Sequence, residues 1–92
     1  MVFEFDQTKS AANLQKHGID FVEAQTLWDD PDVLQRPARS ELETRGMILA
    51  RHNGKLWAAV FTERRNVVRI ISVRRARTNE EALYEKADEN NG

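Results

Sequence analysis

The sequence predicts an α+β domain in which two N-terminal helices pack on a four-stranded antiparallel sheet and a C-terminal helix follows. Two aspartates in good helix-capping positions, Asp6 and Asp20, precede the helical segments. The dipeptide Asn53-Gly54 favours a tight turn and separates two apolar segments with period-two alternation. A third such segment, Val67–Arg75, is rich in β-branched residues. Consecutive strands that are joined by tight turns form an antiparallel sheet, and helices must cover one face of it.

The first 31 residues predict two short helices. Asp6 can cap a helix over Gln7–His17, and Gly18 can adopt the left-handed conformation that ends it. Asp20 starts the second helix, with a glutamate three residues later at the spacing of a capping box, and Pro31 ends it. One apolar face of this second helix should pack on the sheet, and it consists of Phe21, Ala24, Leu27 and Trp28.

Four strands are predicted from the segments between turn signals. Asn53-Gly54 is the strongest hairpin signal of the chain and predicts a two-residue type I′ turn. Residues 38–43 are polar and predict a loop, and Glu63–Asn66 predicts the next turn. The expected strands are Asp32–Arg36 at one edge, Arg45–His52, Lys55–Thr62 and Val67–Arg75.

The chain ends in a predicted helix and a polar tail. Thr78 stands three residues before Glu81, the spacing of a capping box, so we expect Thr78 to cap a helix that runs to about Lys86. Ninety-two residues make one domain, which we place at residues 1–87. Residues 88–92 are polar and are expected to form a flexible tail.

Composition excludes several kinds of chemistry. The chain has no cysteine, so it has no disulfide, no thiol nucleophile and no thiolate zinc site. Its two histidines are too few for a histidine-rich metal site, and we expect neither a metal nor another cofactor. No apolar segment approaches the roughly 20 residues of a membrane span, and no signal-peptide pattern is present. We therefore expect a cytoplasmic protein with no membrane partner.

The charges are strongly segregated although the net charge is only −1. Residues 36–77 contain 11 Lys and Arg against three Asp and Glu, whereas residues 1–35 contain two against seven. Guanidinium groups grip phosphate oxygens bidentately, so this basic segment predicts a binding site for a polyanion. The alternative is a solvated rim that pairs with the acidic helices, where an exposed pair contributes about 0–1 kcal/mol. Six arginines cluster between positions 64 and 77: Arg64, Arg65, Arg69, Arg74, Arg75 and Arg77.

Several single residues allow both a structural and a functional interpretation. His17 is expected at the C-terminal end of the first helix, where an imidazolium is favourable, but an imidazole can also transfer protons near neutral pH. Strict alternation places Arg69 and Arg75 on one face of the last strand and Arg74 on the other. His52 is expected to be exposed beside the hairpin turn. Of the aromatic residues, Trp57 is expected in the core. Tyr84 lies on a polar predicted helix and is expected at the surface.

Four segments of the chain resemble the BrnT toxins: FEFDQTKSAANLQKHGIDFVEAQTLWDDP, VFTERR, VRIISVRRA and EEALYE, between Phe3 and Glu85. The most specific parts are the pattern Lys9…Asn13…Lys16-His17-Gly18 and the stretch 69–76. The sequence departs mildly from the family in Phe5, where Trp is common, and in Val73, where Ala is common.

This resemblance implies a toxin of a type II toxin–antitoxin module with a fold similar to the RelE and ParE toxins. BrnT proteins are metal-independent endoribonucleases that cleave RNA and block translation. A ribbon-helix-helix antitoxin, BrnA, neutralises them, and its dimer can bridge two toxins in a 2:2 heterotetramer that binds operator DNA through the antitoxin. The implied partners are therefore RNA, a BrnA-like antitoxin and, through it, DNA.

Metal-free RNA cleavage needs a proton acceptor, a proton donor and cations at the reacting phosphate. Glu63 is a less favourable candidate for the proton acceptor than His17, because nearby arginines lower the basicity of a carboxylate. Two other functions stay open, a non-catalytic nucleic-acid-binding module and an antitoxin-docking domain. Arginines that converge with His17 on one concave surface would favour catalysis, whereas arginines in separate salt bridges would favour a structural role. The catalytic candidates are His17, Arg64, Arg74 and Arg75, and the RNA-binding candidates are Lys16, Arg69, Arg77 and Tyr84.

Overall fold

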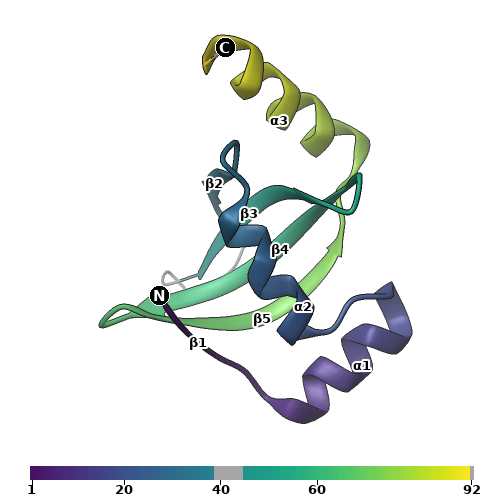
Figure 1. Ribbon diagram of the computed structural model, residues 1–92, viewed down its shortest axis with the longest axis vertical. Coiled ribbons are helices and arrows are strands. Elements are labelled where there is room, and N and C mark those ends of the chain that lie inside the picture. Colours follow the sequence, from purple (N-terminus) through teal and green to yellow (C-terminus); the bar gives the residue numbers. More distant parts are fainter. Residues whose placement is uncertain (39–44, 92) are drawn as a thin grey trace.

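The computed structural model describes residues 1–38 and 45–91, apart from the side chains at positions 88, 90 and 91. The predicted loop at 38–43 lies outside this part of the chain except for its first residue. Figure 1 shows the arrangement of the helices and strands. In chain order they are β1 (Val2–Glu4), α1 (Gln7–His17), α2 (Phe21–Ala24), the 3₁₀ helix η1 (Gln25–Asp29), β2 (Leu34–Pro37), β3 (Arg45–His52), β4 (Lys55–Arg64), β5 (Val67–Arg75) and α3 (Thr78–Asn91).

The sheet has five strands in the order β1-β5-β4-β3-β2, and it is mixed because β1 runs parallel to β5. The α+β class and the antiparallel order of β2 to β5 are confirmed, but the prediction of a four-stranded, wholly antiparallel sheet is wrong. The missing strand, β1, is three residues long and pairs with a segment 65 positions away, Val2 opposite Val67. A strand this short gives no alternation signal in the sequence.

The predicted caps start both N-terminal helices. The backbone N–H of Lys9 donates to Asp6 Oδ1 at 3.0 Å, a hydrogen bond that lowers the pKa of Asp6. The N–H of Glu23 donates to Asp20 Oδ1 at 2.8 Å. The second helix is α-helical for four residues only and continues as η1 up to residue 29.

Two buried polar side chains of α1 fix this helix beside β5. Because β1 pairs with β5 only as far as residue 69, the edge of β5 beyond that point has no strand neighbour among the described residues. Asn13 takes its place: its Oδ1 accepts from Val73 N–H at 3.2 Å, and its Nδ2 donates to the carbonyl of Ile19 at 2.8 Å. Ser10 Oγ accepts from Phe21 N–H at 2.9 Å. These contacts hold the C-terminal end of α1 against the last part of β5.

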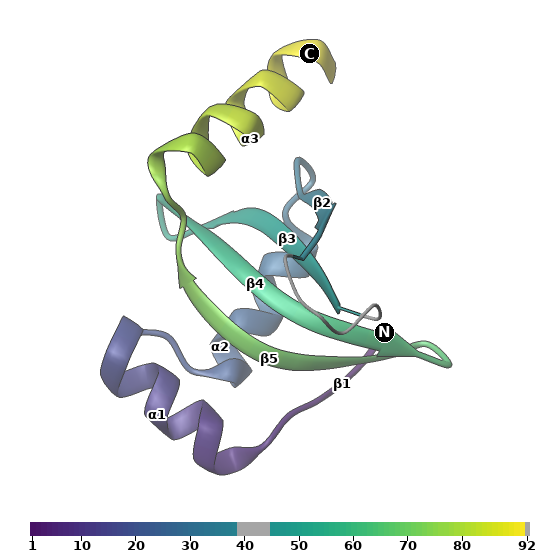
Figure 2. The same cartoon turned by 180° about the vertical axis from the view of Figure 1, so that it is seen from behind.

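The two faces of the sheet differ in what covers them. On the helix face, where α1, α2 and η1 lie, a large core includes Trp57, as predicted. On the opposite face, here called the open face, a smaller cluster of Leu49, Leu56 and Ala58 packs against Tyr84 of α3. Figure 2 shows the sheet from this side, with α2 behind it and α3 extending beyond one end.

A β-bulge in β5 changes which arginines share a face. Phe61 pairs with Ile70 but its neighbour Val60 pairs with Ser72, so residue 71 has no partner on β4. An extra residue reverses the alternation beyond it. The prediction that Arg69 and Arg75 share a face is therefore wrong. The residues opposite them on β4 show that Arg69 and Arg74 lie on the open face and that Arg75, opposite Trp57, lies on the helix face.

The N-cap residue of α3 lies one position earlier than predicted, and the helix ends later than predicted. Glu80 Oε1 accepts the backbone N–H of Arg77 at 2.8 Å, so Arg77 rather than Thr78 occupies the capping position. The helix runs to Asn91 instead of ending near Lys86. The flexibility of residues 88–92 stays a prediction, and Gly92 is not described. No helix in the described ranges is long and apolar enough to cross a membrane.

Candidate active site

A cavity of about 270 Å³ lies where α1 ends beside the β3–β4 hairpin and the last residues of β5. Gly18 ends α1 with a φ of 82°, and Asn53 and Gly54 form the tight turn with φ angles of 52° and 73°. This turn pairs His52 with Lys55. The residues that line the cavity are His17, Gly18, Glu23, His52, Asn53, Lys55, Trp57 and Arg75.

The cavity contains the imidazole of His17 and two cations that no carboxylate of the described residues pairs with. In the described part of the chain, the side chain of His17 makes no hydrogen bond and neither Lys55 nor Arg75 makes a salt bridge. The guanidinium carbon of Arg75 lies 5.5 Å from the centre of the Trp57 ring, so the indole supports it from one side. A cavity with free cations beside a free imidazole can accept an anion and exchange a proton with it.

The second histidine of the cavity is fully engaged within the protein. His52 Nε2 lies 2.8 Å from Glu23 Oε2, and Nδ1 lies 3.1 Å from Thr26 Oγ1. Since Thr26 donates its only hydroxyl hydrogen to the carbonyl of Glu23 at 2.8 Å, Nδ1 is the donor in its contact with Thr26. Both ring nitrogens are therefore occupied by contacts within the protein. The prediction that His52 is exposed is wrong: its side chain is 19% exposed and fastens the hairpin to α2 and η1.

Arg74 points to the other face and has an internal partner. Its Nη1 and Nη2 donate to Glu80 Oε1 and Oε2 at 2.7 and 2.9 Å, and Nη1 also donates to the carbonyl of Arg75 at 3.2 Å. The Glu80 side chain is only 8% exposed. The hydrogen bonds with Arg74 lower the pKa of Glu80, and the same bonds raise the pKa of Arg74. This pair attaches the first turn of α3 to β5.

Tyr84 is buried, so its predicted surface position is wrong. Its hydroxyl donates to Asp30 Oδ2 at 2.8 Å, and burial together with this hydrogen bond raises the pKa of Tyr84 to about 12. Burial also raises the pKa of Asp30, but N–H donors from Arg51 and Asp32 and the Tyr84 hydroxyl outweigh it, and the net shift is downward. Tyr84 therefore offers no exposed ring on which an RNA base can stack.

The remaining candidates do not converge on His17. Arg64 and Arg69 lie on the open face, and Arg69 makes a 3.6 Å salt bridge to Glu4 in which both side chains are about half exposed. Arg77 is exposed at the start of α3, and Lys16 is exposed beside His17 on α1. Of the eight predicted site residues, the cavity brings together His17 and Arg75.

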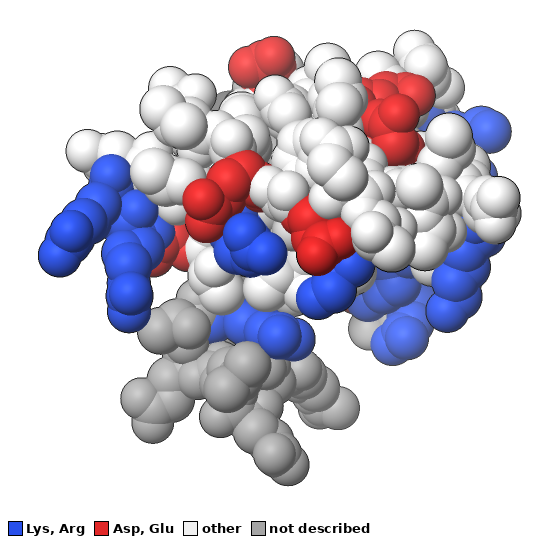
Figure 3. Space-filling view, turned by 90° about the horizontal axis from the view of Figure 1, so that it is seen from below, with Lys and Arg blue, Asp and Glu red and all other residues white. Residues whose placement is uncertain are grey.

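The open face has a cationic surface of its own. The register of the strands assigns to it six arginines from four strands. Figure 3 shows Lys and Arg side chains gathered along the lower half of that view, with most acidic side chains above them. The six arginines that the register assigns to the open face are Arg36, Arg45, Arg51, Arg64, Arg69 and Arg74.

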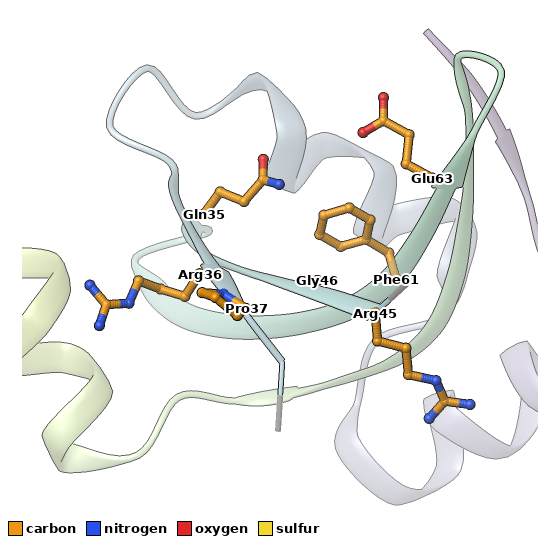
Figure 4. A pocket seen from close by; sticks show the side chains of 7 residues that line it. All are labelled: Gln35, Arg36, Pro37, Arg45, Gly46, Phe61 and Glu63. Atoms are coloured by element: carbon orange, nitrogen blue, oxygen red, sulfur yellow. The ribbon is translucent and has the colours of Figure 1, made fainter. Parts of the chain in front are cut away.

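A larger cavity, about 510 Å³, lies at the opposite end of β3 from His52. Its close-up shows the alternation of the strands: Phe61 and Glu63 point to one side and Arg45 to the other (Figure 4). Its described lining includes no histidine and no lysine, so these residues do not supply the imidazole that the His17 cavity has. Its lining consists of Gln35, Arg36, Pro37, Arg45, Gly46, Phe61 and Glu63.

Sequence reasoning missed Lys55, Glu23 and His52 as parts of the site. One signal was available: a two-residue turn at Asn53-Gly54 pairs the flanking residues, so Lys55 and His52 had to lie side by side. The contact of Glu23 with His52 spans 29 positions and had no local signal. In the described ranges, no group of three or more His, Cys, Asp or Glu is arranged to hold a metal ion.

The fold and the cavity define a small α+β protein that offers free cations and a free imidazole to an anionic ligand. Residues 5–80 match the family model described as the BrnT ribonuclease toxin of type II toxin–antitoxin systems. The chain therefore belongs to the BrnT family, as its sequence motifs indicated. A ribonuclease activity and an antitoxin partner follow from this membership. No curated protein matches the sequence.

Proposed function

We propose that this toxin cleaves RNA at the His17 cavity without a metal ion and thereby inhibits translation. The observation that carries the proposal is that His17, with both ring nitrogens free among the described residues, lines one cavity with Lys55 and Arg75. Family membership supports the ribonuclease activity. The position of the cavity and the chemistry of its side chains support the site.

The proposed reaction is an internal transesterification of the RNA strand. The 2′-hydroxyl oxygen attacks the adjacent phosphorus, the bond from phosphorus to O5′ breaks, and the products are a 2′,3′-cyclic phosphate and a 5′-hydroxyl end. One proton leaves the 2′-hydroxyl and one reaches O5′. A positioned side chain accelerates such proton transfers by about 10²–10⁴-fold. We assign one of these two transfers to His17, because the nitrogens of His52 are occupied by Glu23 and Thr26.

The phosphate would be held by Arg75 and Lys55. The charge on the nonbridging oxygens grows in the transition state, so cations placed in advance stabilise it more than the ground state. Lys16, exposed one residue before His17, is placed to contact a neighbouring phosphate. In this proposal Arg77, which is exposed at the start of α3, contacts the RNA outside the cavity. Arg74, which is fastened to Glu80, acts through the position of α3 rather than on the phosphate.

We place the antitoxin contact on the open face. Interfaces between proteins are enriched in Arg and Met, and here the arginines surround half-buried aliphatic side chains such as Met47, Val60 and Val67. Arg45 Nε is buried there without a hydrogen-bond partner in the described ranges. An acidic segment of a ribbon-helix-helix antitoxin would complement this surface, which includes Arg64 and Arg69. A 2:2 complex that binds operator DNA through the antitoxin completes the proposal.

The test is incubation of the purified toxin with single-stranded RNA in excess EDTA, with His17→Ala and His17→Gln alongside. We expect the wild type to produce 2′,3′-cyclic phosphate ends and both variants to cleave at least about 100-fold more slowly. Melting temperatures of the three proteins should agree, since His17 makes no internal hydrogen bond in the described part of the chain.

Each contrary result has a definite meaning. Cleavage that disappears in EDTA contradicts metal independence, and unchanged cleavage by both variants removes His17 from the mechanism. RNA binding without any product, on free RNA and on translating ribosomes, would favour a non-catalytic binding module. Loss of antitoxin binding after Met47→Asp, with cleavage intact, would support the open-face assignment.

A further inference from the structure

A third cavity, of about 150 Å³, shares part of its lining with the His17 cavity and reaches α3. Lys55 and Arg75 line both cavities, so the two spaces meet at these cations. Arg51 adds a third positive charge. The wall that belongs to α3 carries two carboxylates, Glu81 and Glu85.

The way in which α3 is attached explains why these two carboxylates face the cations. Glu80 and Tyr84, four residues apart, hold the helix to the rest of the protein through Arg74 and Asp30. Glu81 and Glu85 each follow an anchoring residue by one position, which is about 100° around the helix axis. The second pair therefore lies side by side on the flank of α3 that faces the hairpin.

The carboxylates are close enough to act on the cations but do not neutralise them by contact. Neither Glu81 nor Glu85 makes a salt bridge within 4.0 Å to a described Lys or Arg. Because the carboxylates and the cations line one cavity of about 150 Å³, salt screens the fields between them only partly. The positive potential at Lys55 and Arg75 is therefore reduced while both side chains remain free.

We propose that Glu81 and Glu85 compete with RNA phosphate for Lys55 and Arg75 and so set the affinity of the site for RNA. This proposal rests on the proposed function of the His17 cavity. A phosphate bound at the two cations is repelled from the α3 side, where the carboxylates stand. The RNA strand accordingly continues toward the end of α1 rather than beneath α3.

The experiment measures binding of a single-stranded oligouridine whose 2′-hydroxyls are methylated, so that it cannot be cleaved. The double variant Glu81→Gln/Glu85→Gln should bind about three- to tenfold more tightly at low salt, and the gain should shrink as salt is added. Glu89→Gln is the control for the loss of one negative charge from α3, because it lies one turn beyond Glu85 and outside the cavity, and it is compared with Glu85→Gln alone as well as with the double variant. Melting temperatures show whether α3 remains attached.

A second comparison tests whether the effect passes through Lys55. In a Lys55→Gln background the two glutamine substitutions should lose about half of their gain, because one of the two competed cations is gone and Arg75 remains. The proposal is overturned if the double variant binds no more tightly than Glu89→Gln, or if its whole gain persists without Lys55. Wild-type protein that neither binds nor cleaves RNA would overturn the proposed function as well, which separates the two failures.

Discussion

Arg74 and Arg75 are neighbours in the chain and differ in almost everything else. Arg74 lies on the open face, donates three hydrogen bonds and is paired with the nearly buried Glu80. Arg75 lies on the helix face, above the Trp57 ring, and makes no salt bridge in the described ranges. Arginines that are neighbours in the sequence are therefore not always neighbours in space, and the role of each guanidinium depends on the face to which its strand position points.

The same contrast holds for the regions around the two arginines. In the attachment of α3, the charged and polar groups of Arg74, Glu80, Tyr84 and Asp30 satisfy one another, and such groups contribute to stability. In the His17 cavity, His17, Lys55 and Arg75 make no side-chain hydrogen bond or salt bridge with another described residue, and the Trp57 ring supports Arg75 from one side. Side chains kept without partners in this way are characteristic of sites that bind ligands.

The largest effect is expected from Arg74→Ala. It leaves the Glu80 carboxylate nearly buried without its main partner, and breaking a partly buried ion pair of this kind should cost about 2–3 kcal/mol in the free energy of unfolding. Urea unfolding of the purified variant measures the loss.

The control is the reciprocal substitution Glu80→Gln and the double variant. Because the two side chains share one interaction, the double variant should lose less stability than the sum of the single variants. RNA cleavage per folded molecule should stay within about threefold of the wild type under conditions where Arg74→Ala is folded. A variant that is fully stable but inactive would place Arg74 in the RNA site instead.

Arg75→Ala should give the opposite pattern. RNA cleavage should fall about 10- to 100-fold, equivalent to about 1.4–2.7 kcal/mol, because one of the two cations at the proposed phosphate position is lost. The free energy of unfolding should change by no more than about 1 kcal/mol, the value of an exposed cation–π contact. Initial rates on a labelled RNA and a parallel urea titration check both parts, and full activity would remove Arg75 from the site.

The fold could be predicted where local signals act. Asp6 and Asp20 start helices because their side chains accept the N–H groups of residues three positions later. Asn53-Gly54 makes a tight turn because both residues tolerate a positive φ. The features that escaped prediction depend on distant partners: β1 exists only because β5 offers it an edge, and the bulge in β5 shows only in its pairing with β4.

The site was predicted less completely for the same reason. His17 and Arg75 were identified by residue type, and the cavity does bring them together. The bulge separates Arg69 from Arg75, since one extra residue reverses the direction of every later side chain, whereas Arg74 lies on the other face from Arg75 by alternation alone. Tyr84 was assigned to the surface because α3 is polar, yet a polar helix can bury a single ring when its hydroxyl finds a partner such as Asp30.

A smaller effect is expected from Tyr84→Phe, which keeps the buried ring and removes only the hydrogen bond to Asp30. A hydrogen bond to a charged acceptor is worth about 1.5 kcal/mol, and the N–H donors from Arg51 and Asp32 still satisfy the carboxylate. Thermal unfolding should show a modest decrease, with RNA cleavage unchanged. A decrease in RNA binding without loss of stability would contradict the buried position of this ring.

The smallest effect is the pH dependence of the α3 attachment. Because the hydrogen bonds from Arg74 hold the pKa of Glu80 below its ordinary value of 4.5, the folded protein binds this proton less tightly than the unfolded chain. The contribution of the Arg74–Glu80 pair to the free energy of unfolding is therefore complete above that value and is lost as the pH falls through the lowered pKa of the folded state.

The pKa of Asp30 is also lowered, so the wild type must be compared with Glu80→Gln to isolate the titration of Glu80. In urea titrations the stability difference between the two proteins should be constant from about pH 7 to about pH 5 and should narrow at more acid pH. A difference that stays constant down to about pH 3 would mean that Arg74 holds α3 through geometry alone and not through the charge of Glu80.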